Sequence, residues 1–317
     1  IDPLVSGLGD HTKMVREAAV WGLRQILIDD RGWKEVLAAS NSRNDYVRAA
    51  AMRTLVMRVD GVLPGISIDW KDLTKTISYC MNHDQHPAVR AWAMRAAWNW
   101  WYWNPPVRPA LNEAWVELLC RPESDAMVEK AIRYQTHALF IVNGHHANSS
   151  RTHQYKQLGD LFVALQKVLD GTDPNEAASR TRLVRRLVGI AATYYGTSGG
   201  DGGPGQMGYV TPGAGELFGR AFLDYFKMIE SLRIDPDADQ YRLQIGLEGA
   251  ANIPHRELQQ KLIHYSLNGP DELRTIAATS VSDPRSAQLV AVPEMIEPLI
   301  RQIHRGAEDA PRRSQLS

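Results

Sequence analysis

The sequence is organised around the segment His86-Pro87-Ala88-Val89-Arg90-Ala91-Trp92-Ala93-Met94-Arg95-Ala96-Ala97-Trp98. Pro87 stands where the first turn of a helix tolerates proline, because the N–H that proline lacks has no partner there. Val89, Ala93 and Ala97 then fall on one stripe at four-residue spacing, which is the pattern of an amphipathic helix. The segment therefore predicts a helix that begins near Pro87 and packs through small apolar residues.

Copies of this segment recur along the chain, each marked by an apolar residue followed by a charged one, in most cases Val-Arg. The residues four and eight positions after each apolar residue are nearly all apolar and never charged, which predicts a buried stripe. A second amphipathic segment follows each copy. The copies are anchored at Val15-Arg16, Val47-Arg48, Val89-Arg90, Val128-Glu129, Val184-Arg185, Tyr241-Arg242 and Leu273-Arg274. The second segments are Trp33–Ala39, Trp70–Cys80, Leu111–Cys120, Tyr155–Leu169, Glu216–Leu232, Glu257–Leu267 and Glu294–Ile303.

This alternation predicts an all-α fold in which about seven helix pairs stack as an α-α superhelix. One helix pair cannot bury its apolar stripe alone, whereas stacking buries the stripe against the next pair. We therefore expect a single repeat domain over residues 1–317. Its approximate repeats are 10–42, 43–83, 84–122, 123–172, 173–234, 235–269 and 270–305, followed by a tail over 306–317.

The unit Asp-x-x-x-x-Val-Arg-x-x-Ala, seen from Asp10 to Ala19 and from Asp84 to Ala93, resembles the HEAT repeats of armadillo-like α-solenoids. The fourth repeat departs from the pattern, because Glu129 replaces the arginine. In HEAT proteins this Asp and this Arg pair between neighbouring repeats. The resemblance thus implies structural roles for Asp10, Arg16, Arg48, Asp84 and Arg90. It concerns the fold and says little about activity.

The charge balance and the apolar content of the sequence bear on which partners the protein binds. Lys plus Arg and Asp plus Glu number 36 each, so the 317-residue chain has a formal net charge of zero. Nucleic-acid-binding proteins usually carry a basic excess, so we expect no nucleic-acid partner. No apolar run reaches the roughly 18 residues of a membrane helix, so we expect no membrane span. Because the chain begins at Ile1 rather than Met, we expect a processed product or a fragment.

The two cysteines, Cys80 and Cys120, each end a second segment in consecutive repeats. We expect free thiols that act as small apolar groups. A disulfide between them is the alternative, because stacking could bring them together, and it would indicate an oxidising compartment. The sequence leaves the compartment open.

Three connections depart from short turns, namely residues 98–106, 143–153 and 196–215. If each joins the first to the second helix of its repeat, all three emerge on the same edge of the stack. Long loops in compact domains are uncommon and often functional. We therefore expect one partner-binding edge in the middle of the chain. Its candidate residues are Trp100, Trp101, Tyr102, Trp103, His145, His146, His153, Asp201 and Tyr209.

Each of these connections also has a structural interpretation. Trp98 and Trp101 can belong to the core, rather than to an aromatic platform for a protein or a sugar. The histidines are expected to be solvated, and a metal or haem contact through His145, His146 and His153 is the weaker alternative. The glycine-rich loop lacks the Lys and Ser/Thr of a phosphate-binding loop, and Asp201 alone is too little for a calcium site. We therefore predict no metal and no cofactor.

No catalytic motif stands out, and the paired His-Glu dipeptides of HEAT-like di-iron hydroxylases are absent from the sequence. We expect a non-enzymatic scaffold or interaction subunit that docks a protein partner, or a neighbouring domain of a larger assembly, through the solenoid surface and its loops. One alternative is a solenoid-based enzyme or lyase with a pocket at the loop edge. Another is an accessory subunit that contacts a metal or haem through the loop histidines.

Overall fold

The computed structural model describes most of the first two thirds of the chain and part of the last third. Contacts divide the chain into two compact units, unit 1 with Ile1–Val142 and Ala147–Arg182, and unit 2 with Asn143–His146 and Leu183–Ser317. That one repeat domain spans both units stays a prediction. The described residues are 2–26, 30–56, 69–142, 152–171, 176–196, 209–210, 214–230, 253, 255–269, 274, 277–278 and 300.

Unit 1 is built mainly from helices, and the helices expected around its anchors Val15, Val47, Val89 and Val128 and in the second segments that follow them are confirmed. Its elements are α1 (Asp2–Gly7), α2 (Lys13–Ile26), α3 (Asp30–Ala39), α4 (Asp45–Leu55), α5 (Trp70–His83), α6 (Pro87–Trp103), the 3-10 helix η1 (Pro105–Val107), α7 (Arg108–Cys120), α8 (Ala126–Phe140), the two-residue strand β1 (Ile141–Val142) and α9 (Thr152–Asp170). The short helix α1, which the repeat pattern does not include, packs on α2 and α3. The helices expected around Tyr241 and Leu273 and over Glu294–Ile303 lie largely outside the described residues.

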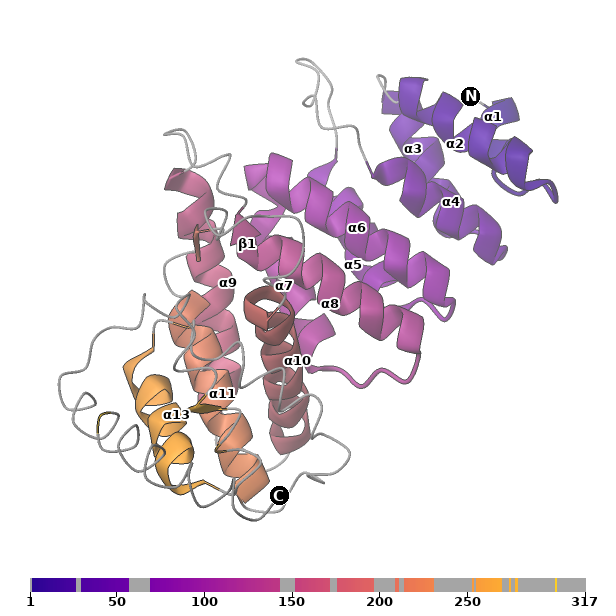
Figure 1. Ribbon diagram of the computed structural model, residues 1–317. Coiled ribbons are helices and arrows are strands. Elements are labelled where there is room, and N and C mark those ends of the chain that lie inside the picture. The colour runs from indigo at the N-terminus through magenta and orange to yellow at the C-terminus, as the bar shows by residue number, and fades with distance from the viewer. Residues whose placement is uncertain are drawn as a thin grey trace, which may run out of the picture. The chain divides into compact units, whose positions relative to one another are not determined.

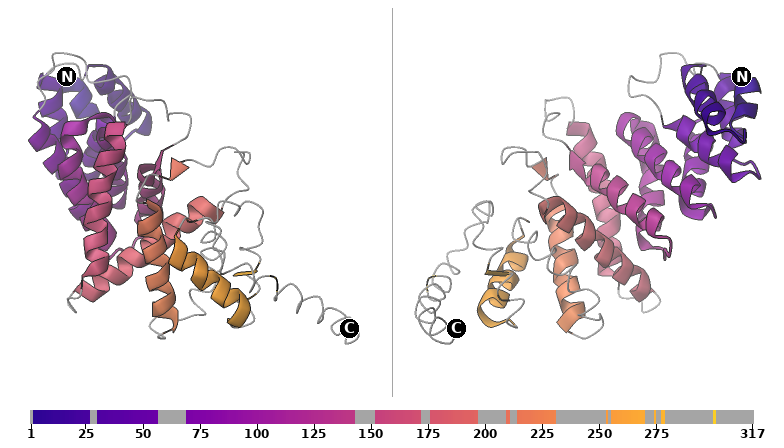
Figure 2. Two further views of the ribbon diagram at one scale, coloured as in Figure 1. Left: turned by 90° about the vertical axis from the view of Figure 1, so that its left-hand side faces the viewer. Right: turned by 45° about the vertical axis from the view of Figure 1, so that its right-hand side comes forward.

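The helices of unit 1 form two layers. The first helices of the repeats, α2, α4, α6 and α8, pack against one another in chain order, and the second helices, α3, α5, α7 and α9, do the same. The layers are joined where α3 packs on α4 and α5 on α6. Figure 1 views the stack with α4, α6 and α8 in front, and Figure 2 shows it from two further sides. This arrangement is an α-solenoid, and the predicted all-α fold class is confirmed.

The core of unit 1 is the predicted stripe of small and branched residues. Along α6, Val89, Ala93 and Ala97 are fully buried. On α2 and α4 the residues four and eight positions after the anchor are buried, whereas the anchor Val15 is 42% exposed and the anchor Val47 is half-buried, which corrects the expected stripe at these two positions. Because alanine carries little bulk, neighbouring first helices approach closely. The equivalent buried residues are Ala19 and Leu23 on α2 and Ala51 and Leu55 on α4.

Side chains at the turns determine where these helices begin. The Asn44 side chain accepts a hydrogen bond from the Tyr46 N–H, and Asp69 accepts from two N–H groups in the first turn of α5. At α6, His86 caps the helix through the Ala88 N–H, and Pro87 occupies the first turn as predicted. Such caps satisfy N–H groups that have no partner inside the helix.

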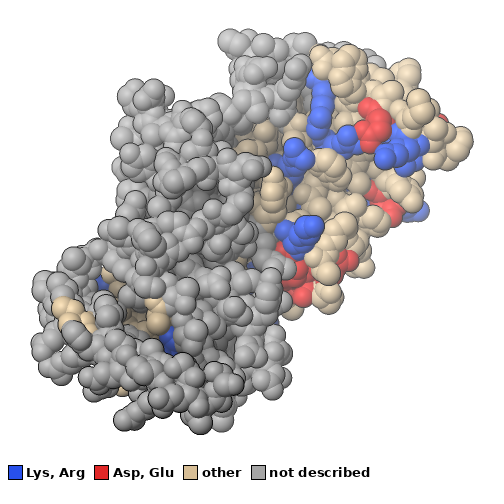
Figure 3. Space-filling model, in the orientation of Figure 1, with Lys and Arg blue, Asp and Glu red and all other residues tan. Residues whose placement is uncertain are grey.

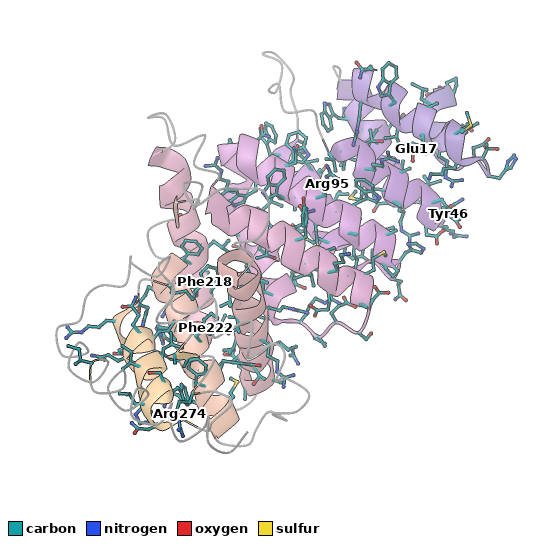
Figure 4. The ribbon with its side chains drawn as sticks, viewed as in Figure 1. Glu17, Tyr46, Arg95, Phe218, Phe222 and Arg274 are labelled. Atoms are coloured by element: carbon teal, nitrogen blue, oxygen red, sulfur yellow. The ribbon has the colours of Figure 1, made fainter. Side chains whose placement is uncertain are left out.

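The helix α10 (Ala177–Gly196) begins in unit 1 and continues into unit 2. The other described elements of unit 2 are the two-residue strand β2 (Tyr209–Val210), α11 (Ala214–Glu230) and α13 (Arg256–Asn268). α11 packs on α13, with Phe226 edge-to-face on Tyr265 at a centroid distance of 5.2 Å. Figure 4 labels Phe218 and Phe222, which are buried on α11 as the spacing of its aromatic residues predicts.

Both cysteines are free, which confirms the expected thiols. Cys80 is buried at the end of α5, and burial raises the pKa of its thiol to about 12. Cys120 is half-buried at the end of α7. A thiol with so high a pKa carries almost no thiolate at neutral pH, so Cys80 acts as a small apolar group.

Candidate docking face

Most of the residues predicted for a partner-binding edge lie where the structure does not describe their side chains. The expected edge therefore stays a prediction. His145, His146 and Asp201 lie outside the described residues, and Tyr102 and Trp103 in α6, His153 in α9 and Tyr209 in β2 are described only as backbone.

Trp100 and Trp101 are core residues, which corrects the expectation that they face a partner. The segment from Trp98 to Trp103 is the last part of α6 and no loop. Trp100 has no exposed surface, and its Nε1 donates to the Leu55 carbonyl at 2.8 Å. Trp101 is 2% exposed, and its Nε1 donates to Asn112 Oδ1 at 2.7 Å. Both indoles satisfy their polar atom inside the protein, as buried Trp side chains usually do.

The outer surface of the first-helix layer carries large exposed side chains in two rows. One row lies one position before the anchors Val15, Val47 and Val128, and the other lies six positions after the anchors. Met14, Tyr46 and Met127 form the first row, with exposed fractions of 80%, 59% and 51%. Trp21, Arg53, Arg95 and Tyr134 form the second row, in which Trp21 and Tyr134 are 67% and 70% exposed.

Helix geometry explains why the two rows share one surface. Positions seven residues apart are separated by about two turns, so they lie on the same side of a helix. That side is opposite the buried stripe, whose residues stand four and eight positions after each anchor. We call the resulting surface the first-helix face. It comprises the two rows together with Glu17, Arg24 and Trp92.

Arginine side chains pack on a tryptophan ring in the middle of the first-helix face. The Cζ atom of Arg53 lies 5.1 Å from the ring centroid of Trp92, and that of Arg95 lies 5.6 Å from the same centroid. Such distances are typical of cation–π contacts. Arg24 of α2 donates from Nη2 to the Arg53 carbonyl, so the cluster extends over α2, α4 and α6.

The electrostatics of this cluster are dominated by its guanidinium groups. Burial lowers the pKa of Arg24, and the nearby charges of Arg53 and Arg95 lower it further. Glu17 forms an ion pair with Arg53, and the hydrogen bond from Arg53 lowers the pKa of Glu17. Figure 4 labels Glu17, Tyr46 and Arg95 on this surface, and Figure 3 shows basic side chains lying across it with acidic ones between them.

A separate set of ion pairs joins neighbouring repeats at the turns before the first helices. Arg48 donates from Nε and Nη2 to the Asp84 carboxylate at 2.7 and 3.0 Å, and from Nη1 to the Ser42 carbonyl at 2.9 Å. Arg90 pairs with Glu123 in a similar way, from Nη1 and Nη2 at 2.6 and 3.2 Å. Charge-assisted bonds of this bidentate kind are among the stronger ones in proteins.

The acceptors of these pairs stand at one recurring position. It lies six residues before the charged residue of the anchor that follows it in the chain. Asp10, Ser42, Asp84 and Glu123 hold that position, and the side chain of each accepts from the N–H two residues later. Burial raises the pKa of Asp84, but hydrogen bonds from Arg48 and from the His86 N–H outweigh it and leave the pKa below its usual value. Arg16 donates to the carbonyls of Asp10 and His11 and lies 5.0 Å from the Tyr46 ring.

Ser42 is the member of this series that lacks a carboxylate. The substitution Ser42→Asp should give Arg16 the carboxylate that Arg48 and Arg90 have, and raise the free energy of unfolding by about 0.5 kcal/mol. Urea denaturation followed by tryptophan fluorescence measures the change. In an Arg16→Gln background the gain should disappear, and it should shrink at high salt. An equal gain in that background would mean that the introduced carboxylate only caps α4.

The part of the chain that the structure describes contains no group of three His, Cys, Asp or Glu residues placed to hold a metal ion. Among the same residues, no helix has both the length and the apolar character that crossing a bilayer requires.

Similar proteins were found among solved structures alone. No protein-family model and no curated protein sequence matches the chain. Among solved structures it is similar to an engineered protein, at 18% identity and a TM-score of 0.35, over 78% of this chain and 97% of the other. A designed armadillo repeat protein shows 16% identity and a TM-score of 0.28, over 57% of this chain and 81% of its own.

A third similar structure, described in terms of a phosphorylation switch that controls the interaction between cadherin and beta-catenin, shows 16% identity and a TM-score of 0.31. It covers 95% of this chain and 57% of its own. These TM-scores are too low to carry an argument about function. The helix packing of unit 1, described above, therefore remains the basis for the α-solenoid.

Proposed function

We propose that the protein is a non-enzymatic scaffold that docks a protein partner through the first-helix face of unit 1. The observation that carries this proposal is the recurrence of large exposed side chains at the same two positions in successive repeats. Met14, Trp21, Tyr46 and Tyr134 each expose more than half of their surface. Aromatic residues, Met and Arg are enriched at protein interfaces, and contiguous exposed apolar surface marks interaction sites.

The stacked architecture supports the same function. Adjacent repeats place equivalent side chains side by side, at interhelical distances of about 10 Å. A row of such positions offers a long surface, which solenoids commonly use for binding. Trp and Arg are also the residues that most often dominate binding energy.

We also propose that the repeats are HEAT-like and that the chain serves as a subunit of a larger assembly. The Asp84 and Arg48 pair joins two consecutive repeats, as the resemblance to HEAT repeats implies. The loop edge over residues 143–153 and 196–215 is proposed as a second contact region, which the described residues do not test.

Capture of partners by the tagged chain tests the docking proposal. We expect Trp21→Ala and Tyr46→Ala to reduce recovery of a stoichiometric protein partner from the native source, because they remove exposed anchors. The matched control is Tyr79→Ala, which removes a 58% exposed tyrosine from α5 in the second-helix layer. All three variants should keep the wild-type melting temperature, since exposed substitutions change stability little. Recovery that Trp21→Ala leaves intact, or that Tyr79→Ala alone reduces, contradicts the proposal.

A further inference from the structure

The arginines of the first-helix face, Arg24, Arg53 and Arg95, carry more positive charge than the acidic side chain beside them neutralises. Among the residues that the structure describes, Glu17 supplies the carboxylate of the cluster, and it pairs with Arg53. Arg24 donates to a main-chain carbonyl, and Arg95 lies against the Trp92 ring. A carbonyl and a ring bear no net charge, so the cluster of Arg24, Arg53, Arg95 and Glu17 has a net charge of about +2 at neutral pH.

The cluster is also accessible and already ordered. Arg95 is exposed, and the side chains of Arg53 and Glu17 are 30% and 41% exposed. Contacts with Trp92 and with the α4 main chain limit the freedom of the guanidinium groups before any partner arrives. A preordered arginine loses less conformational entropy on binding, which favours recognition.

We infer that the first-helix face binds an extended acidic segment of a partner protein, whose carboxylates meet Arg24, Arg53 and Arg95. The inference rests on the docking function proposed above and names the chemistry of the partner. Guanidinium groups bind carboxylates with two parallel hydrogen bonds, and charge complementarity steers such partners to the surface. Apolar side chains between the carboxylates have the exposed ring of Trp21 to pack on.

The spacing of the cluster fits an extended chain. Arg53 and Arg95 come from adjacent first helices, and their Cζ atoms lie 5.1 and 5.6 Å from one shared ring. Adjacent helices are about 10 Å apart, and an extended chain in the polyproline II conformation advances about 3.1 Å per residue with every third side chain on the same side. A carboxylate at every third residue or so would therefore match successive first helices.

Other anionic macromolecules fit the molecule less well. Nucleic-acid-binding proteins usually show a basic excess, whereas this chain has a net charge of zero. A membrane surface would favour a larger basic cluster than three arginines. Trp21, Tyr46 and Met14 further indicate a surface that packs on side chains.

Selection from a random-peptide phage library against the full chain tests the inference. We expect the recovered peptides to be rich in Asp and Glu with interspersed apolar residues. A fluorescent synthetic copy of the consensus should then bind about tenfold or more weakly to Arg95→Glu than to the wild type. Replacing every acidic residue of that peptide by its amide should weaken binding similarly, and raising the salt concentration should weaken it as well.

The matched control is Lys75→Glu, which makes the same charge change at an exposed residue of α5 in the second-helix layer. We expect it to bind the peptide as the wild type does. Because Arg95 is exposed, circular dichroism should show wild-type helix content for both variants. Neutral or basic consensus peptides, or acidic peptides that bind Arg95→Glu equally well, would overturn the inference.

Two further outcomes separate this inference from the docking function. Neutral peptides whose binding requires Trp21 would overturn the acidic partner and leave docking at this face intact. Peptides that need neither Trp21 nor Arg95 would overturn both. Vesicles of phosphatidylserine with phosphatidylcholine and a single-stranded DNA serve as competing probes. If either binds in an Arg95-dependent way while acidic peptides do not, the inference is wrong.

Discussion

Replacing Trp100 by alanine is expected to lower the free energy of unfolding of unit 1 by about 3–5 kcal/mol. Trp100 is fully buried, and its ring meets the edges or faces of Trp33 and Trp70 at centroid distances of 5.3 and 5.7 Å. Removing the indole leaves a large cavity among elements from three repeats. It also leaves the Leu55 carbonyl without the hydrogen bond from Nε1.

Intrinsic fluorescence during urea denaturation measures this loss selectively, because all nine tryptophans lie in unit 1. Trp21→Ala is the matched control, since it makes the same change at an exposed position and should alter stability by about 0.5 kcal/mol or less. Trp100→Phe should fall between the two, because it keeps most of the ring and loses the hydrogen bond. Equal midpoints for Trp100→Ala and the wild type would show that the indole is not part of the core.

The second large effect is expected at Gly219 in unit 2. Ala normally stabilises a helix relative to Gly by about 1 kcal/mol, but here we expect Gly219→Ala to destabilise by about 2–4 kcal/mol. A Cβ at this position of α11 would lie 2.1 Å from Cγ of His255. The His255 ring is buried and caps α13 by accepting from the Leu258 N–H at 3.2 Å. The clash therefore displaces a helix cap as well as a core side chain.

A double-mutant cycle isolates the cause. A Cβ added at Gly219 would also lie 2.4 Å from the Cβ of His255, so the background is His255→Gly, which removes both the ring and that Cβ. In this background Gly219→Ala should cost little or restore the ordinary stabilising effect. Thermal unfolding followed by far-ultraviolet circular dichroism measures each variant, because unit 2 has no tryptophan. A stability gain from Gly219→Ala in the wild-type background would contradict the close approach of α11 and α13.

The helix pairs were predictable because their signal is local and repeated. A buried stripe of Ala, Val and Leu at four-residue spacing leaves few alternatives to a helix, and each copy supports the others. The end of α6 was not predictable in this way. Trp100 and Trp101 are adjacent and both buried, since α6 packs on α4, α5 and α8 at once. A helix enclosed on several sides buries more than one stripe. Its consecutive aromatic residues therefore do not show the four-residue spacing of an amphipathic helix, and in the sequence alone they indicate a loop.

The residues of the first-helix face were missed for a different reason. The stripe that predicts the helices consists of the anchor and the positions four and eight residues later, which face the core or its edge. The position six residues after the anchor, occupied by Trp21, Arg53, Arg95 and Tyr134, carried a signal of its own in the form of large residues on the solvent side. Glu123 was also missed, because it replaces the expected Asp and precedes Glu129 rather than an arginine.

The turn before each first helix keeps a constant interval in a chain whose repeats otherwise differ in length. Asp10 to Arg16, Ser42 to Arg48 and Asp84 to Arg90 each span six positions. In the Arg48–Asp84 and Arg90–Glu123 pairs the acceptor belongs to one repeat and the donor to the preceding one, so this turn is a recurring joint between repeats. Gene duplications and deletions with breakpoints at this joint would keep donors and acceptors matched. Breakpoints inside a helix pair would separate a donor from its acceptor. The joint therefore marks the places where the number of repeats can change without loss of these ion pairs.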